Sequence, residues 1–180
     1  MKKFSFGCMK KMLLGIVVVV VCICAVLNGF GLVKTSNRPD ANYPLSIQIR
    51  EKIQTEGMGL TPEECVKYSL KLTSENLRFT ERNSIANGKA NCVGYAILCS
   101  SICNYALQIN HLNYKSKPAV GYVTFYGINL CDVLKALAPQ EVKNYVKDHD
   151  FVELELDDKV VFFDACLYDY HIDGTTIIRK

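Results

Sequence analysis

Two alternating runs of apolar and polar residues near the C-terminus constrain the fold of this chain more than any other feature. The runs cover residues 149–156 and 159–166, and Asp157 and Asp158 separate them. Two turn-forming residues between alternating runs predict a β-hairpin. With Asp157 and Asp158 as the turn, residue 156 pairs with 159, 151 with 164 and 149 with 166.

The predicted register assigns the hairpin side chains to two faces, because successive residues of a strand point in opposite directions. The expected core face carries Val152, Leu154, Leu156, Val161, Phe163 and Ala165. The other face carries His149, Phe151, Glu153, Phe162, Asp164 and Cys166. His149 and Asp164 are then diagonal neighbours, about 7–8 Å apart at the backbone and within side-chain reach of each other.

Cys92 lies where a cysteine can become a nucleophile. Asn91 is a good N-cap, and an apolar helix is expected from residue 92 to about 108. The unpaired N–H groups and the positive dipole end of a helix start favour a thiolate over a thiol. Cysteines at helix starts are also common packing residues, so a structural role for Cys92 is the alternative.

A nucleophilic Cys, a His base and an Asp that orients the imidazole together form a thiol triad. We predict Cys92 as the nucleophile, His149 as the base and Asp164 as the orienting residue. Two other histidines compete for the role of base. His111 lies in a polar loop, and no predicted strand places His171 beside Asp164.

Three blocks of the sequence resemble the transglutaminase-like superfamily, a branch of the papain-like cysteine enzymes. Gly88–Ala96 is similar to the helix start that carries the family's cysteine, and Lys117–Val123 to the strand that follows it. His149–Leu154 with Phe162–Asp164 is similar to the hairpin that carries the family's His and Asp. The chain has no Trp, and Phe151 occupies the position of the usual aromatic residue.

This resemblance implies an α+β fold of the transglutaminase-like or papain-like kind, with helices packed on an antiparallel sheet. It also implies that Cys92 attacks an amide carbonyl of a protein or peptide substrate and forms an acyl-enzyme. Water then gives peptidase or amidase chemistry, and a second amine gives transamidation; the sequence leaves both open. The alternative is a catalytically inactive transglutaminase-like module with a binding or structural role in the cell envelope.

The N-terminal segment predicts an association with a membrane. Lysines at positions 2, 3, 10 and 11 precede sixteen uncharged, almost wholly apolar residues, Met12 to Leu27, and a weaker apolar stretch reaches Val33. A helix of about 20 residues crosses a hydrocarbon core of about 30 Å. We favour a retained anchor over a cleaved signal peptide, because no Ala-x-Ala cleavage site is present. The basic flank predicts that the C-terminal domain lies on the non-cytoplasmic side of the cell membrane or in the envelope.

The predicted organisation has three parts: an anchor or signal segment at 1–34, a linker and lead-in at 35–60, and a transglutaminase-like domain at 61–180. Thr61 and Pro62 predict the start of a helix that reaches about Leu72. The other expected elements are a short strand at 77–79, a strand at 117–126, two short helices within 130–146 and a final strand at 175–178.

The excess of basic residues comes from the N-terminal segment of the chain. The formal net charge is +3, but residues 38–180 hold 16 basic and 18 acidic residues. This balance argues against a nucleic-acid partner. The sequence has neither a C-x-x-C pair nor a calcium-loop motif, so no metal or cofactor is expected.

Six cysteines follow the apolar segment, at positions 65, 92, 99, 103, 131 and 166. Helical spacing places Cys99 and Cys103 under Cys92, in the expected core. Disulfides are compatible with an oxidising environment, and their connectivity cannot be read from the spacing. A bridged Cys92 would favour the structural alternative.

Overall fold

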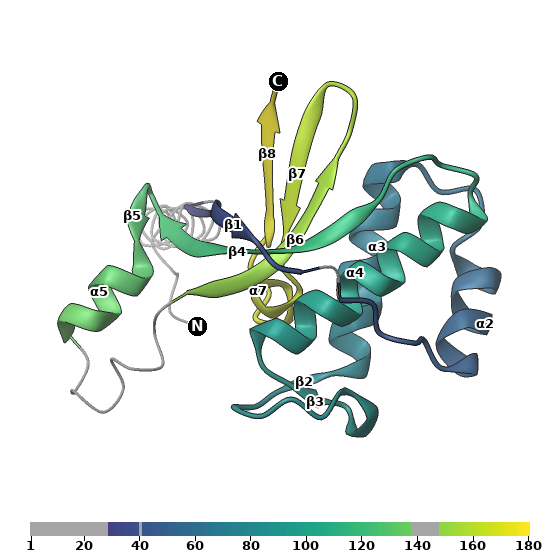
Figure 1. Cartoon of the computed structure of the whole chain (residues 1–180), viewed down its shortest axis with the longest axis horizontal. Coiled ribbons are helices and arrows are strands. Elements are labelled where there is room, and N and C mark those ends of the chain that lie inside the picture. The colour runs from purple at the N-terminus through teal and green to yellow at the C-terminus, as the bar shows by residue number, and fades with distance from the viewer. Residues whose placement is uncertain (1–28, 40, 138–147) are drawn as a thin grey trace, which may run out of the picture.

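A computed structural model of the chain describes residues 29–39, 41–137 and 148–180. Residues 1–28 of the predicted membrane segment, which include the uncharged run from Met12 to Leu27, and the second short helix expected after Pro139 lie outside the described residues. Figure 1 shows a strongly twisted antiparallel sheet with the main helices gathered beside it. The α+β class and the packing of helices on an antiparallel sheet are therefore confirmed.

The main sheet has the strand order β1-β4-β6-β7-β8, with the short strand β5 added beside β4. Its strands are β1 (Phe30–Asn37), β4 (Ser116–Phe125), β5 (Ile128–Asn129), β6 (His149–Glu155), β7 (Lys159–Phe163) and β8 (Thr175–Arg179). The sheet is curled so far that its first and last strands meet. The backbone N–H of Leu32 on β1 donates a 2.9 Å hydrogen bond to Oγ1 of Thr176 on β8.

Helix α4 lies at the centre of the helical layer. The helices are α2 (Ile47–Glu56), α3 (Pro62–Asn76), α4 (Cys92–Ile109), α5 (Leu130–Leu137) and α7 (Ala165–Asp169). Within the described part of the chain, α4 alone is long and apolar enough to cross a membrane, but it is mostly buried. It is therefore the core helix of this domain. The helix α3 begins at Pro62, as predicted, and a capping box between Thr61 and Glu64 closes its first turn.

The sheet separates two apolar cores. The larger core lies between the helices and one face of the sheet, and it contains all six residues of the expected hairpin core face. The smaller core lies on the other face, within the curl, and consists of Leu32, Ala119, Val123, Phe151 and Phe162. Burial on both faces explains why β6 is hidden along most of its length.

The hairpin register is the predicted one. Val152 pairs with Phe163 and Glu155 with Val160, and the N–H of Leu156 donates to the carbonyl of Lys159 across the Asp-Asp turn. The prediction for Cys166 is wrong. Strand β7 ends at Phe163, so Cys166 lies in helix α7 and its side chain joins the larger core.

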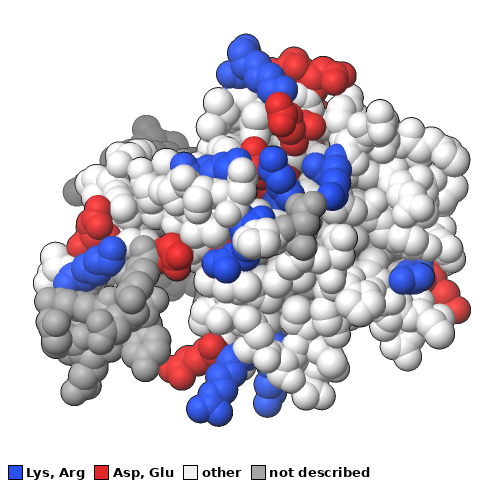
Figure 2. Space-filling view, viewed as in Figure 1, with Lys and Arg blue, Asp and Glu red and all other residues white. Residues whose placement is uncertain are grey.

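Charged side chains connect three neighbouring strands on the face that bears the smaller core. Glu153 on β6 forms an ion pair with Lys34 on β1, in which Nζ lies 2.6 Å from Oε2. Nζ of Lys117 on β4 lies 3.8 Å from the same oxygen. Figure 2 shows blue and red side chains next to each other in the middle of the face in view. These pairs compensate the charge of Glu153, which is 6% exposed.

Strand β1 corrects the expected domain organisation. Phe30–Asn37 were expected to end the apolar segment and begin a linker, but they pair along β4 from Phe125 to Ala119. The boundary at residues 34 and 35 therefore falls inside a strand. The expected lead-in also contains α2, whose Ile53 is fully buried in the larger core.

We predict that a chain beginning at Gly29 is as stable as the full domain, whereas one beginning at Asn37 is much less stable. Loss of β1 removes Leu32 from the smaller core and leaves the edge of β4 unpaired. The melting temperature should fall by about 10 °C or more, with aggregation on size-exclusion chromatography. Equal melting temperatures for the two truncated chains would contradict this role of β1.

Candidate active site

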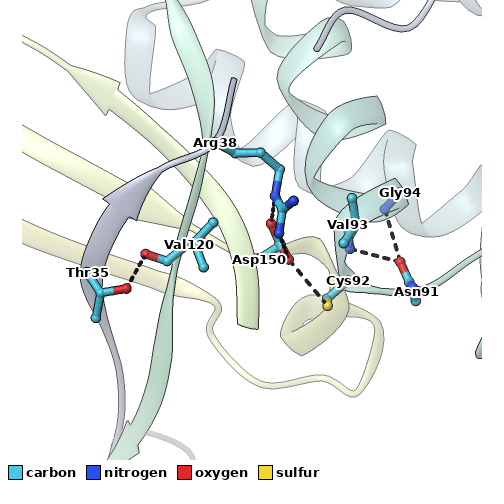
Figure 3. A network of polar contacts seen from close by, with 8 residues as sticks. All are labelled: Thr35, Arg38, Asn91, Cys92, Val93, Gly94, Val120 and Asp150. Carbon is cyan, nitrogen blue, oxygen red and sulfur yellow. Dashed lines mark hydrogen bonds and ion pairs between the residues drawn. The ribbon is translucent and has the colours of Figure 1, made fainter. Parts of the chain in front are cut away.

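Cys92 is the first residue of α4, as predicted. The side-chain oxygen of Asn91 accepts hydrogen bonds from the N–H groups of Val93 (3.1 Å) and Gly94 (3.4 Å), which caps the helix. Figure 3 shows this cap beside the Cys92 sulfur. The thiol is partly exposed and lies at the positive end of the helix.

A tight loop fixes the position of this helix start. The loop includes the parallel pair of β2 (Arg78–Phe79) and β3 (Lys89–Ala90). Its Asn83 accepts a 2.8 Å hydrogen bond from the N–H of Asn91. A Cβ atom at Gly94 would lie 2.6 Å from both Asn83 and Ala90, so only glycine permits this contact. The contacts of Asn83 with Asn91 and of Asn83 and Ala90 with Gly94 therefore fix the backbone on both sides of Cys92.

Tyr95 connects the same helix start to α7. Its ring is completely buried, and its hydroxyl donates a 3.0 Å hydrogen bond to Asp169 at the end of α7. Because α7 begins directly after Asp164, this bond relates the position of Cys92 to that of the predicted orienting carboxylate.

His149 and Asp164 are in direct contact, as their predicted diagonal arrangement required. The distance from Nε2 of His149 to Oδ2 of Asp164 is 2.5 Å. The other carboxylate oxygen of Asp164 accepts a 2.8 Å hydrogen bond from the N–H of Cys166, because Asp164 is the N-cap of α7. The N–H of Asp164 also donates to the carbonyl of Gly174. The buried carboxylate thus has little freedom to turn away from the ring.

The surroundings of His149 favour the protonated ring. Burial alone would lower its pKa, but the charge and hydrogen bond of Asp164 raise it, and interactions with the Cys92 side chain add to this effect. The pKa of His149 is consequently held well above its usual range. Since Nε2 faces Asp164, Nδ1 is the ring nitrogen that remains for the thiol.

The two competing histidines lie elsewhere. His111 follows the C-terminal end of α4, opposite the end that carries Cys92, and His171 follows α7. Both are exposed, and both have a positive φ, 55° for His111 and 60° for His171. The structure thus brings Cys92, His149 and Asp164 together and leaves these two histidines in surface turns.

Two charged residues at the site were missed by the sequence analysis. Oδ2 of Asp150 lies 3.8 Å from the Cys92 sulfur, and Arg38 binds both oxygens of this carboxylate, at 3.0 Å through Nη2 and at closer range through Nε. Figure 3 shows Asp150 between Arg38 and the Cys92 sulfur. Asp150 is only 1% exposed. The signal was present in the sequence, because alternation places Asp150 on the otherwise apolar core face, where a carboxylate requires a cation.

A β-bulge directs Arg38 toward this carboxylate. Lys34 pairs with Gly121 and Ser36 with the adjacent Val120, so Thr35 is an extra residue in β1. One extra residue exchanges the faces of all residues that follow it. Lys34 therefore faces the side of the smaller core, whereas Arg38 faces α4. The Thr35 hydroxyl donates a 3.1 Å hydrogen bond to the carbonyl of Val120 at the bulge (Figure 3).

All six cysteines of the described residues are free, so Cys92 is unbridged. Burial raises the pKa of Cys65 to about 11 and that of Cys99 to about 12. Burial also raises the pKa values of Cys103, Cys131 and Cys166. The predicted core position of Cys99 and Cys103 is confirmed. Cys92 is the one partly exposed thiol among these six.

Within the described ranges, no three His, Cys, Asp or Glu side chains are grouped so that they could hold a metal ion. The groups available for chemistry are therefore the thiol of Cys92, the His149–Asp164 pair and the Asp150–Arg38 pair. No family model, curated protein or solved structure matches this chain.

We predict that protonation of His149 contributes to stability. Because its folded pKa is raised above the unfolded value of about 6.5, the contribution is fully present below pH 6.5 and is lost as the pH rises through the folded value. Melting temperatures of the wild type and of His149→Gln, measured from pH 6 to pH 9, should converge at high pH. His171→Gln, at an exposed site, is the control and should follow the wild type. A constant difference across this range would contradict the prediction.

Proposed function

We propose that this protein is a thiol enzyme that acts on amide bonds, with Cys92 as nucleophile, His149 as acid and base, and Asp164 as the orienting residue. One observation carries the proposal: a buried carboxylate lies 2.5 Å from the imidazole of His149, and the Cys92 side chain at the start of α4 is close enough to contribute to the raised pKa of the same ring. A nucleophile, a base and an orienting group in this sequence of contacts constitute a triad.

In the proposed reaction, the Cys92 thiolate attacks the amide carbonyl carbon and forms a C–S bond. Protonated His149 donates its proton to the amine nitrogen, the C–N bond breaks, and an acyl-enzyme remains. The neutral ring then takes a proton from water or from an amine, which attacks the thioester and releases Cys92. Asn91 occupies the N–H groups of Val93 and Gly94, so the N–H of Cys92 is the proposed oxyanion donor.

We also propose that the fold is of the transglutaminase-like kind and that the protein is held in a membrane by its N-terminal segment. The chain order Cys, His, Asp and the placement of the nucleophile on a helix and its partners on a hairpin support the first point. The uncharged run from Met12 to Leu27 supports the second. Peptidase or amidase chemistry and transamidation both fit this site, since they differ only in what attacks the thioester.

A specific observation favours a second candidate, a non-catalytic binding module. The Asp150 carboxylate lies 3.8 Å from the Cys92 sulfur, and a negative charge at that distance opposes formation of a thiolate. Arg38 compensates this charge through two contacts. How far the positive charge of Arg38 offsets the negative charge of Asp150 at the Cys92 sulfur therefore distinguishes the two candidates.

We predict that iodoacetamide labels Cys92 faster than any other cysteine of residues 29–180, because the other five cysteines of that range are buried. Labelling sites and rates are measured by mass spectrometry after peptide digestion. His149→Ala and Asp164→Asn should each slow labelling of Cys92, by about tenfold or more, while the slow labelling of the other five stays unchanged.

The same variants test turnover on a library of fluorogenic peptide amides, with and without a primary amine as acceptor. Cys92→Ala should abolish product formation, and Asp164→Asn should reduce it by about 10²- to 10⁴-fold. His171→Ala is the matched control and should keep full activity. If iodoacetamide labels Cys92 no faster than Cys65 or Cys131, or if the wild type turns over no amide, the non-catalytic module takes the place of the enzyme.

We predict opposite effects for the two members of the Asp150–Arg38 pair. Arg38→Met leaves a buried unpaired carboxylate beside the thiol, so it should slow labelling of Cys92 and cost about 3 kcal/mol of stability. Asp150→Asn removes the negative charge and should accelerate labelling at neutral pH.

The double variant Arg38→Met with Asp150→Asn should regain much of the lost stability and labelling rate, because neither charge is then left alone. Labelling rates from pH 5 to pH 10 and melting curves of all four proteins give the complete cycle. Strictly additive effects on both quantities would show that the pair does not act on Cys92 as a unit.

A further inference from the structure

The turn between β4 and β5 exposes a cluster of apolar side chains, which we call the aromatic tip. It consists of Phe30, Phe125, Tyr126 and Ile128. Tyr126 is 63% exposed and Ile128 is 59% exposed. The ring centroids of Phe125 and Tyr126 lie 4.9 Å apart, and those of Phe30 and Phe125 lie 5.1 Å apart. The three rings therefore form one continuous surface, and Ile128 pairs with Phe125 across the turn.

The aromatic tip lies where the described chain begins. The N–H of Tyr126 donates a 2.7 Å hydrogen bond to the carbonyl of Gly29. A Cβ atom at Gly29 would lie 2.6 Å from the ring of Tyr126 and 2.7 Å from that of Phe125. The rings thus cover the backbone of Gly29 directly, and a larger residue there would displace them.

The segments that form the aromatic tip carry no charge. No Asp, Glu, Lys or Arg occurs in residues 29–33 or in residues 119–131. Exposed hairpins and edge strands of soluble proteins are usually protected by charged side chains. The other hairpin of this sheet follows that rule, because its turn contains Asp157 and Asp158 and is followed by Lys159. Figure 1 shows the two turns at separate corners of the sheet.

The N-terminal sequence supplies the reason for this difference. The uncharged apolar run ends at Leu27, two residues before Gly29. Two residues span at most about 7 Å of extended chain. The headgroup layer on each side of a hydrocarbon core is about 5–7 Å thick. With Met12 to Leu27 in a bilayer, Gly29 and the rings that cover it must lie in or against that layer.

We propose that the aromatic tip docks in the lipid headgroup layer of the membrane that holds the N-terminal segment. Tyr rings are suited to this layer, because their bodies are apolar and their hydroxyls are polar. The inference rests on the proposed membrane anchor and is independent of the proposed thiol chemistry.

Docking at this point defines the orientation of the domain. Strand β4 runs from the aromatic tip at Phe125 to Gly121, which pairs with His149. Four residues of a strand span about 14 Å. The strand therefore places Gly121, the partner of His149, within about 14 Å of the aromatic tip, so the candidate active site is close to protein or peptide segments that are themselves attached to or near the bilayer.

Tryptophan fluorescence tests the proposal, because the chain contains no Trp. The full chain with Tyr126→Trp is reconstituted in vesicles of phosphatidylcholine and phosphatidylglycerol. Its emission should be shifted to the blue, and lipids brominated near the headgroup end of the acyl chain should quench it about twofold. Ile128→Trp is a second reporter at the aromatic tip, in case the first variant does not fold.

Tyr170→Trp is the matched control. Tyr170 is the same residue type with nearly the same exposure, 64%, but it lies in a surface groove next to β2, away from β5 in Figure 1. Its emission should resemble that of Trp in water, without quenching by brominated lipid.

The outcomes separate the docking from the anchor. If the chain resists carbonate extraction from the vesicles but neither Tyr126→Trp nor Ile128→Trp shows quenching, docking is overturned and the anchor stands. If the chain does not stay with the vesicles, the anchor fails and the docking fails with it, whereas the labelling of Cys92 remains a separate test. A blue shift without quenching that grows with the protein-to-lipid ratio would assign the aromatic tip to a second copy of the chain and overturn the proposal.

Discussion

The hydrogen bonds of Asp164 are the constraint on which the candidate site depends. One carboxylate oxygen caps helix α7 through the N–H of Cys166, and the other lies 2.5 Å from His149. A single buried side chain therefore ends strand β7, starts α7 and orients the ring. The hydroxyl of Tyr95 on α4 donates a hydrogen bond to Asp169 at the end of α7, which connects α7 to the helix that carries Cys92. Without Asp164, α4 and β6 would still pack together in the larger core, but the His149 ring would lose the carboxylate that orients it toward the start of α4.

Two neighbouring groups have opposite effects on the Cys92 thiol. Asp164 favours the protonated, positively charged ring of His149. The negatively charged carboxylate of Asp150 lies 3.8 Å from the Cys92 sulfur. Arg38 binds both oxygens of Asp150 and thereby offsets the negative charge of this carboxylate beside Cys92. Reactivity at such a site depends on charge compensation by a residue that lies far from Cys92 in sequence, just after strand β1.

Strand β1 connects the two functional proposals. It begins at the aromatic tip with Phe30, which packs against the ring of Phe125, and the chain reaches Arg38 directly after the strand ends at Asn37. The bulge at Thr35 turns the strand over between these ends. A strand that forms backbone hydrogen bonds along β4 is a stiff connection, so the same element links the aromatic tip proposed to dock at a membrane with the guanidinium beside Asp150.

Local structure could be predicted from the amino-acid sequence alone: the Asn91 cap, the hairpin register and the contact between His149 and Asp164 all follow from short-range patterns. Alternation and turn residues act over a few positions, so they can be read without knowing the rest of the fold. The strand β1 and the contact of Arg38 with Asp150 became visible only in the folded chain. Alternation indicates that Asp150 is buried and requires a cation, but the partner lies 112 residues away in sequence and reaches the carboxylate only because of one extra residue in a strand, which no local pattern specifies.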